Sequence, residues 1–81
     1  MKIVDSIHFQ NMLKERGILR EWVDRAIDCP ARTENRDDGT RHFLVQIPEN
    51  GNRWLRVVVN IKTTPGKAVT AFFDRRLRRQ A

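Results

Sequence analysis

Several residue types and motifs are absent from this chain, and each absence narrows its class. It contains no tyrosine and a single cysteine, which cannot form an internal disulfide, so a disulfide-stapled secreted domain is disfavoured and we expect a cytoplasmic protein. It has no apolar run of about 18 residues and no apolar leader, so we expect neither a membrane span nor a signal peptide. It has no metal-ligand spacing and no glycine-rich phosphate loop, so we expect no metal and no cofactor.

Acidic residues are scarce in the last third of the chain. Residues 51–81 carry eight basic side chains and one acidic one, whereas residues 1–30 carry five of each and residues 31–50 carry three basic and four acidic ones. The excess behind the net charge of +6 therefore lies in that last third. Segregated positive charge favours a polyanion, most often nucleic acid, or an acidic protein as partner. Solubility is the alternative, although it does not require the charge to be segregated.

Two segments have the three- and four-residue apolar spacing of helices, residues 6–16 and residues 19–28. Asp5 or Ser6 can cap the first helix, and Gly17 can end it, because glycine adopts the left-handed conformation at little cost. Pro30 closes the second. The short connection between the two segments predicts a helix hairpin with one shared apolar side.

After the helices the apolar period changes to two, and turn signals divide the chain into four short strands. We expect strands at residues 31–35, 41–47, 54–62 and 68–73. Their short connections predict an antiparallel meander. The predicted fold class is α+β, with the helix hairpin packed on one face of a four-stranded antiparallel sheet in the order α-α-β-β-β-β. Residues 1–81 are expected to form one domain.

The alternation of side chains assigns the strand residues to two faces. The face expected to meet the helices carries Phe43, Val45, Ile47, Leu55, Val57, Val59, Ile61, Val69, Ala71 and Phe73. The other face, called the open face below, carries His42, Leu44, Gln46, Trp54, Arg56, Val58, Asn60, Lys62, Ala68, Thr70 and Phe72. This mixture of aromatic rings and cations suits base stacking and phosphate contacts with single-stranded RNA. A small apolar patch covered by the tail or by a second chain is the alternative.

Four segments of the chain carry a resemblance to a known family. SIHFQNMLKERGILREWVDRAIDCP, followed by GTRHFLVQI, RWLRVVVNIK and AVTAFF, resembles a small uncharacterised bacterial domain family similar to the RelE/ParE-like toxins, especially the BrnT-like ones. The recurring family positions are matched by Ser6, His8, Arg16, Gly17, Ile18, Val23 and Pro30. The chain departs from the family at Met12, where arginine is frequent, and at Leu19, where a capping serine or threonine is frequent.

The resemblance implies a RelE-like fold and a toxin-like protein of a bacterial toxin–antitoxin system, with RNA as target and a small antitoxin as partner. RelE-type ribonucleases commonly use a tyrosine near the C-terminus, and this chain has none. The same fold also carries toxins that are not ribonucleases, so the fold alone does not decide the chemistry. A noncatalytic module that binds nucleic acid or protein is therefore the alternative, and the sequence leaves the oligomeric state open.

A metal-independent endoribonuclease needs an acid, a base and cations around the phosphate. The candidates for these catalytic roles are His42, Lys62, Arg56 and Arg75. The candidates for RNA binding are Trp54, Arg56, Asn60, Lys62, Phe72, Arg75, Arg76, Arg78 and Arg79. A solvated residue at the start of a strand is the simpler interpretation of His42 taken alone.

The basic tail at residues 74–81 surrounds one apolar residue, Leu77, with four arginines. We expect a short turn that docks Leu77 on the edge of the open face and directs the arginines along a groove. Contact with a phosphate backbone or with an antitoxin would both use this arrangement. A solvated tail is the alternative, because chain ends are commonly disordered.

Overall fold

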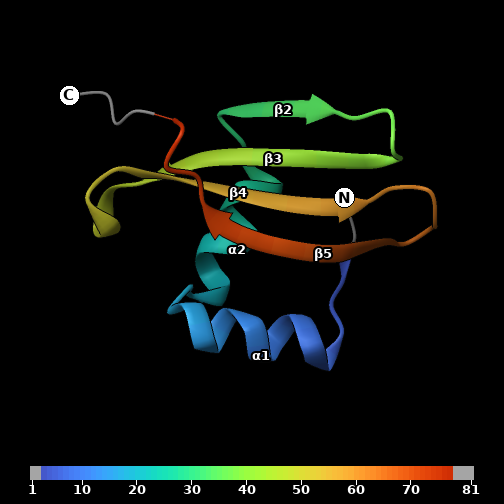
Figure 1. Cartoon of the computed structure of the whole chain (residues 1–81), viewed down its shortest axis with the longest axis horizontal. Coiled ribbons are helices and arrows are strands. Elements are labelled where there is room, and N and C mark those ends of the chain that lie inside the picture. Colours follow the sequence, from blue (N-terminus) through green and yellow to red (C-terminus); the bar gives the residue numbers. More distant parts are fainter. Residues whose placement is uncertain (1–2, 78–81) are drawn as a thin grey trace.

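Two helices lie on one side of a twisted sheet in the computed structural model, which describes residues 3–77 (Figure 1). The elements along the chain are β1 (Ile3–Val4), α1 (Ile7–Arg16), α2 (Arg20–Asp28), β2 (Arg32–Asn35), β3 (Thr40–Ile47), the 3-10 turn η1 (Pro48–Asn50), β4 (Arg53–Asn60) and β5 (Gly66–Phe73). The strand order across the sheet is β1-β5-β4-β3-β2. The α+β class and the antiparallel meander from β2 to β5 are confirmed.

The predicted number of strands was wrong, because β1 adds a fifth. Ile3 and Val4 pair in parallel with Gly66 and Lys67, so the sheet is mixed rather than purely antiparallel. A strand of two residues is too short to show a period of two, so β1 could not be predicted from the alternation of residues. Since β1 pairs with only the first two residues of β5, the rest of that edge has no neighbouring strand within residues 3–77.

Local contacts explain where α1 begins and how it meets the sheet. The Ser6 hydroxyl accepts a hydrogen bond from the Phe9 N–H at 3.1 Å, and Gly17 ends the helix with a φ of 67°. Arg16 Nη1 then donates to the backbone oxygen of Ala71 at 2.7 Å, which ties α1 to the unpaired edge of β5. Within residues 3–77, neither helix has the length and apolar character that crossing a bilayer requires.

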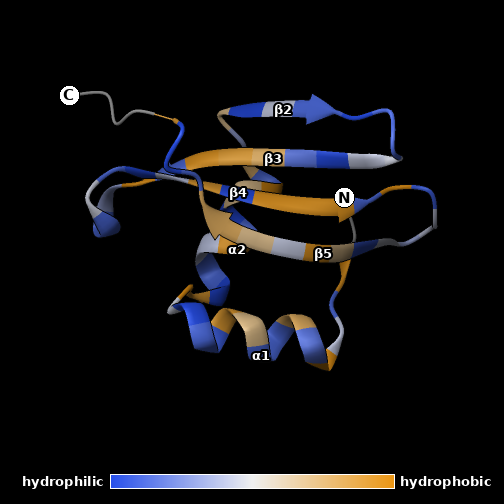
Figure 2. Cartoon of the chain, viewed as in Figure 1, coloured by the Kyte–Doolittle hydropathy of each residue, from blue (hydrophilic) through white to orange (hydrophobic). Residues whose placement is uncertain are grey.

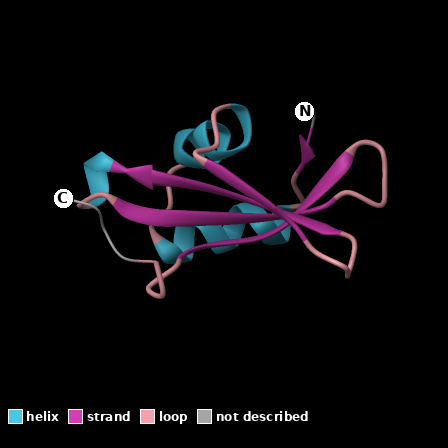
Figure 3. Ribbon diagram, turned by 90° about the horizontal axis from the view of Figure 1, so that it is seen from above, coloured by secondary structure: helices cyan, strands magenta, loops and turns pink. Residues whose placement is uncertain are grey.

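The hydrophobic core lies between the helices and the sheet, as predicted. The buried cluster contains Phe9, Leu13, Ile18, Trp22, Val23, Ala26, Phe43, Ile47, Leu55, Val57, Val59 and Ala71. Apolar colour follows the central strands in Figure 2, whereas β2 is mostly polar. The strands fan out when the sheet is seen from above (Figure 3), as the usual twist of a sheet requires.

One residue assigned to the core face lies elsewhere. Val69 was predicted to face the helices, but the residue is 48% exposed. The register between β4 and β5 shifts there: Val58 pairs with Thr70, and Val59 pairs with Ala68. A single step on β4 thus spans two residues of β5, which is a β-bulge. The extra residue reverses the alternation, so Ala68, which was predicted to lie on the open face, packs against the core in place of Val69.

Candidate functional site

The open face of the sheet is not covered by either helix (Figure 1). Parts of it are nevertheless buried: Leu44 has no exposed surface, and Arg56 is only 4% exposed. A buried guanidinium needs partners, because an unpaired charge removed from water is costly. The partners of Arg56 therefore define a buried polar cluster on this face.

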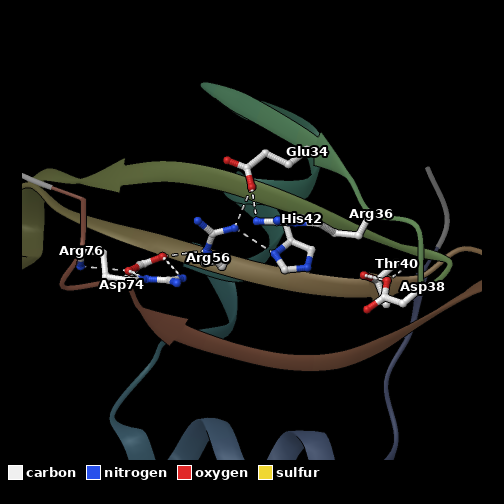
Figure 4. Close-up of polar contacts among 8 residues, drawn as sticks. All are labelled: Glu34, Arg36, Asp38, Thr40, His42, Arg56, Asp74 and Arg76. Carbon is white, nitrogen blue, oxygen red and sulfur yellow. Dashed lines mark hydrogen bonds and ion pairs between the residues drawn. The ribbon is translucent and has the colours of Figure 1, made fainter.

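Three side chains from three other segments of the chain converge around Arg56 (Figure 4). Arg56 Nε donates to Asp74 Oδ2 at 2.8 Å, and Arg56 Nη1 donates to Glu34 Oε1 at 3.0 Å. Arg56 Nη1 also lies 2.9 Å from His42 Nδ1. Glu34 lies directly opposite His42 in the β2–β3 ladder, so the register of the sheet creates this group. We call Glu34, His42, Arg56 and Asp74 the Arg56 cluster.

His42 is held in one tautomer by this arrangement. Arginine has only hydrogen-bond donors, so the Nδ1 atom of His42 must accept, and the proton of the neutral ring lies on Nε2. Partial burial lowers the pKa of His42, and the charges of Arg56 and Arg36 lower it further, against the opposing effect of Glu34 and Asp38. The ring is therefore neutral near pH 7.

Asp74 is the carboxylate that anchors the end of β5 to the open face. Its Oδ1 atom accepts from the Arg76 backbone N–H at 2.9 Å and from Arg76 Nε at 3.0 Å, while its Oδ2 atom also accepts from Arg76 Nη2 at 3.0 Å. These hydrogen bonds from Arg76, followed by that from Arg56, hold the pKa of Asp74 well below its usual range. Hydrogen bonding to Arg56 likewise lowers the pKa of Glu34. Both carboxylates are therefore charged at neutral pH.

The four catalytic candidates do not converge on one point. His42 and Arg56 are in contact, but Lys62 follows the end of β4 and lies over the turn at Gly39, where an added Cβ would be 2.0 Å from the Lys62 Cε. Arg75 follows β5, whose last residue Phe73 pairs near the start of β4. Lys62 and Arg75 therefore lie at opposite ends of the sheet. Arg56 is buried with its Nε and Nη1 donors occupied, so it does not present them to a ligand.

The aromatic candidates lie toward the end of the sheet where Arg75 is found. Trp54 and Phe72 are half-buried, and the Arg32 guanidinium carbon lies 5.4 Å from the centroid of the Trp54 ring. Arg32 was not among the predicted site residues, because assigning it to this face needs the β2 register. At the opposite end, Asn60 Oδ1 accepts from the Lys62 N–H at 2.9 Å, which braces the turn.

The beginning of the tail forms the expected turn. The Leu77 N–H donates to the Asp74 backbone oxygen at 3.3 Å, and Leu77 is half-buried. The Arg76 side chain is 76% exposed even though it is paired with Asp74. Arg78 and Arg79, which were also predicted to bind RNA, lie outside the described residues.

Glu34 and Asp74 are members of the Arg56 cluster that sequence reasoning missed. Asp74 had one visible signal, since it is the single acid within residues 51–81 and comes directly after an apolar strand. Glu34 had none, because the strand that carries it is short and polar. Both were hidden because their partner is far along the chain, at Arg56.

Comparison with known family models finds a match over most of the sequence. A model described as a domain of unknown function (DUF4258) matches residues 6–73, which include both helices and strands β2 to β5. Comparisons with curated proteins and with solved structures find no match. The similarity to RelE/ParE-like toxins thus stays a prediction. The DUF4258 model covers most of the sequence. The chain belongs to the DUF4258 family.

Proposed function

We propose that this chain is a toxin-like protein that binds single-stranded RNA on its open face and is neutralised by a small antitoxin. The observation that carries the proposal is the Arg32–Trp54 pair on a sheet face without a helix cover. An exposed guanidinium backed by an indole ring offers a flat cation on which a base can stack. The toxin role rests on the resemblance of the sequence to RelE/ParE-like toxins.

The charges around this pair support binding to a polyanion. Arg56 is neutralised by Asp74 and Glu34, so it adds little attraction of its own. Arg32 and Arg75, by contrast, are exposed and make no ion pair with a carboxylate within residues 3–77. When exposed unpaired cations contact phosphates, the counterions condensed on the nucleic acid are released. This release supplies much of the affinity for nucleic acid.

The geometry supports RNA binding better than RNA cleavage. A general base needs a lone pair directed at the 2′-hydroxyl, but the lone pair of His42 Nδ1 is occupied by Arg56. The other nitrogen carries the proton, so it can donate a hydrogen bond but cannot accept the hydroxyl proton. Metal-independent cleavage is the second candidate, and the observation that favours it is the lowered pKa of His42, which keeps the ring neutral.

Fluorescence anisotropy with a labelled single-stranded RNA, measured over a range of salt concentrations, tests the binding proposal. Trp54→Ala should weaken binding by about 1–3 kcal/mol, the usual loss for one stacked base. Arg32→Ala should weaken binding. It should also make the slope of log affinity against log salt concentration shallower, by about the amount due to one phosphate contact. Arg20→Ala is the matched control, because Arg20 lies in α2 on the helix side and is paired with Asp5 and Asp24.

Equal losses of affinity in the Trp54 variant and in the Arg20 control would contradict the proposal, since they would show charge attraction without a defined binding face.

Truncation after Asp74 tests the tail separately, because it removes four arginines and should further flatten the dependence of affinity on salt concentration. Growth arrest on expression tests the toxin role. Arrest that persists in a folded Arg32→Ala/Trp54→Ala variant would separate toxicity from RNA binding.

A further inference from the structure

A second cationic region lies at the end of the sheet, around the unpaired edge of β5. A shallow groove of about 420 Å³ is lined there by Arg16, Gly17, Ile18, Asn50, Arg53, Phe72, Phe73 and Arg75. Three arginines and two aromatic residues are present, and none of these eight residues is acidic. We propose that this groove binds the phosphate group of a nucleotide, either free or at the end of an RNA strand.

The arginines of the groove differ from most other arginines of the described chain. Arg20, Arg25, Arg36, Arg56 and Arg76 each form an ion pair with a carboxylate. Arg16, Arg53 and Arg75 form none within residues 3–77. Like charges that share a concave site and lack internal counterions raise the local concentration of anions. Three of the arginines that make no ion pair with a carboxylate within residues 3–77 thus line one groove.

Two of these guanidinium groups are held in place before any ligand arrives. Arg16 Nη1 donates to the Ala71 backbone oxygen at 2.7 Å and to the Thr70 hydroxyl at 3.2 Å. The Arg53 guanidinium carbon lies 4.7 Å from the centroid of the Phe73 ring. A guanidinium has five N–H donors, so these contacts leave other donors available. Fixing the side chains in advance reduces the entropy lost when an anion binds.

The elements around the groove explain why these residues meet. Arg16 is the last residue of α1, Arg53 begins β4, and Arg75 follows β5. The end of α1 and the arrowhead of β5 lie at the same end of the molecule in Figure 1. The carbonyl end of α1 would repel an anion, but two of its carbonyls, those of Leu13 and Lys14, already accept the N–H groups that cap the helix.

The chemistry of the groove favours a phosphate over other anions. The planar donor fork of arginine matches phosphate oxygens, and several arginines suit the double charge of a phosphate monoester better than a single carboxylate. Phe72 and Phe73 add apolar rings beside the charge, where a base or a ribose can pack. A nucleotide supplies both groups, whereas an acidic peptide supplies carboxylates without a ring.

This inference deepens the proposed RNA binding by naming where a phosphate is held. It can be tested without an RNA strand, because a free mononucleotide is a sufficient probe. Trp54 and Arg32 do not line the groove, so their replacement should leave mononucleotide binding intact. Absence of RNA-strand binding therefore contradicts the proposed function, whereas absence of mononucleotide binding contradicts the proposal for the groove.

Nuclear magnetic resonance titration of the ¹⁵N-labelled protein with adenosine 5′-monophosphate provides the test, with adenosine as the ligand control. We expect the monophosphate to shift the amide signals of Gly17, Asn50 and Phe73, and adenosine to leave them in place. Arg53→Gln and Arg75→Gln should each weaken the binding about tenfold, as expected for losing a hydrogen bond to a charged group. Lys67→Gln is the matched control, since Lys67 is an exposed cation at the opposite end of β5.

The source of the phosphate follows from two oligonucleotides of identical sequence, one with a 5′-phosphate and one with a 5′-hydroxyl. If the protein prefers the phosphorylated strand and Arg53→Gln removes this preference, the groove binds the end of a strand. If both strands bind with equal affinity, the groove is assigned to free nucleotides. Equal shifts with adenosine, or an equal loss in Lys67→Gln, would overturn the proposal. Tighter binding of hexaglutamate than of the monophosphate at these same amides would assign the groove to an acidic peptide and would overturn it too.

Discussion

The two faces of the sheet bury their residues by different means. The face toward the helices buries Val57 completely, within an apolar cluster to which both helices and the sheet contribute. The open face has no helix above it, yet Arg56 on the same strand is 4% exposed. Its cover consists of two carboxylates, Glu34 from β2 and Asp74 after β5, together with the neutral ring of His42 from β3. Adjacent residues of one strand are thus buried by hydrophobic packing on one side and by ion pairing on the other.

This difference has a consequence for how each face tolerates change. Hydrophobic burial depends on area and is shared among many neighbours, so one altered contact removes a fraction of it. A buried ion pair depends on each partner, because removing one leaves the other charged and without compensation. We therefore expect the domain to lose stability when a charged side chain is introduced on the helix-covered face. On the open face we expect the loss when one charged partner of the Arg56 cluster is removed.

The largest expected effect is on the helix-covered face. Val57→Asp places a carboxylate where the native side chain has no exposed surface. An isolated buried charge costs several kcal/mol, and a domain of this size has only about 3–5 kcal/mol of stability from its core. We expect Val57→Asp to be unfolded at 25 °C by circular dichroism.

Val69→Asp is the matched control for this prediction, on the neighbouring strand. The bulge places Val69 outside the core, where the residue is 48% exposed, so we expect the free energy of unfolding to change by no more than about 0.5 kcal/mol. A folded Val57→Asp domain, or an unfolded Val69→Asp domain, would contradict the assignment of the two faces.

The next effect is on the open face. Arg56→Met keeps most of the side-chain volume but leaves Asp74 and Glu34 without their buried partner. Breaking a buried pair from one side costs about 3–5 kcal/mol, and the remaining pairing of Asp74 with Arg76 places the expected loss at about 3 kcal/mol. Urea unfolding of the purified variant measures it.

Arg25→Met is the corresponding change at an exposed pair. Arg25 forms two hydrogen bonds with Glu49, but both side chains are open to solvent, so the loss should be below about 1 kcal/mol. If the two arginine variants lose equal stability, burial does not distinguish the Arg56 cluster from an ordinary surface pair.

The third effect is a dependence of stability on acid. The pKa of Asp74 is lower in the folded protein than its unfolded value of about 3.9, so this group stabilises the fold above that pH. The stabilisation is lost as pH falls below about 4 and through the lowered folded pKa. The free energy of unfolding should therefore fall more steeply below pH 4 in the native chain than in Asp74→Asn, as measured by urea unfolding at several pH values. Parallel curves would show that Asp74 gains nothing from Arg76 and Arg56.

The helix-covered face could be predicted from the sequence because its signals are local. Ser6 and Gly17 mark the ends of α1, and period-two alternation identifies the strands. The bulge at Val69 could not be predicted, because nothing in the alternating pattern shows which residue is extra. β1 was missed for a related reason, since its partner is far along the chain and its length is two residues.

The membership of the open face was predicted better than its contacts. Alternation places His42, Arg56 and Phe72 on one face, and their positions in the ladders agree. Which donor meets which acceptor depends on the register of β2 and on the turn after β5, neither of which a periodic pattern specifies. The sequence therefore predicted an available Arg56, whereas its partners are Glu34 and Asp74.

The smallest expected effect separates the structural role of His42 from a catalytic one. A glutamine side-chain oxygen can accept from Arg56 as His42 Nδ1 does, so His42→Gln should change stability by less than about 1 kcal/mol at pH 7.5. Protonation of Nδ1 would set a second cation against Arg56 and Arg36, which is part of why the pKa of His42 is lowered. A lowered folded pKa means that this group stabilises the fold above its unfolded value of about 6.5 and ceases to do so as pH falls through the folded value.

Urea unfolding between about pH 7 and pH 5 should accordingly show a decline in the native chain that is smaller in His42→Gln, because glutamine does not titrate. Glu34 and Asp38 oppose the shift, so the difference between the two curves should be modest. Single-turnover assays on a defined RNA complete the comparison: we expect no cleavage by either protein and unchanged binding in the variant. Cleavage by the native chain that is lost in His42→Gln would assign His42 to catalysis, and it would require the Arg56 contact to break before the ring can accept a proton.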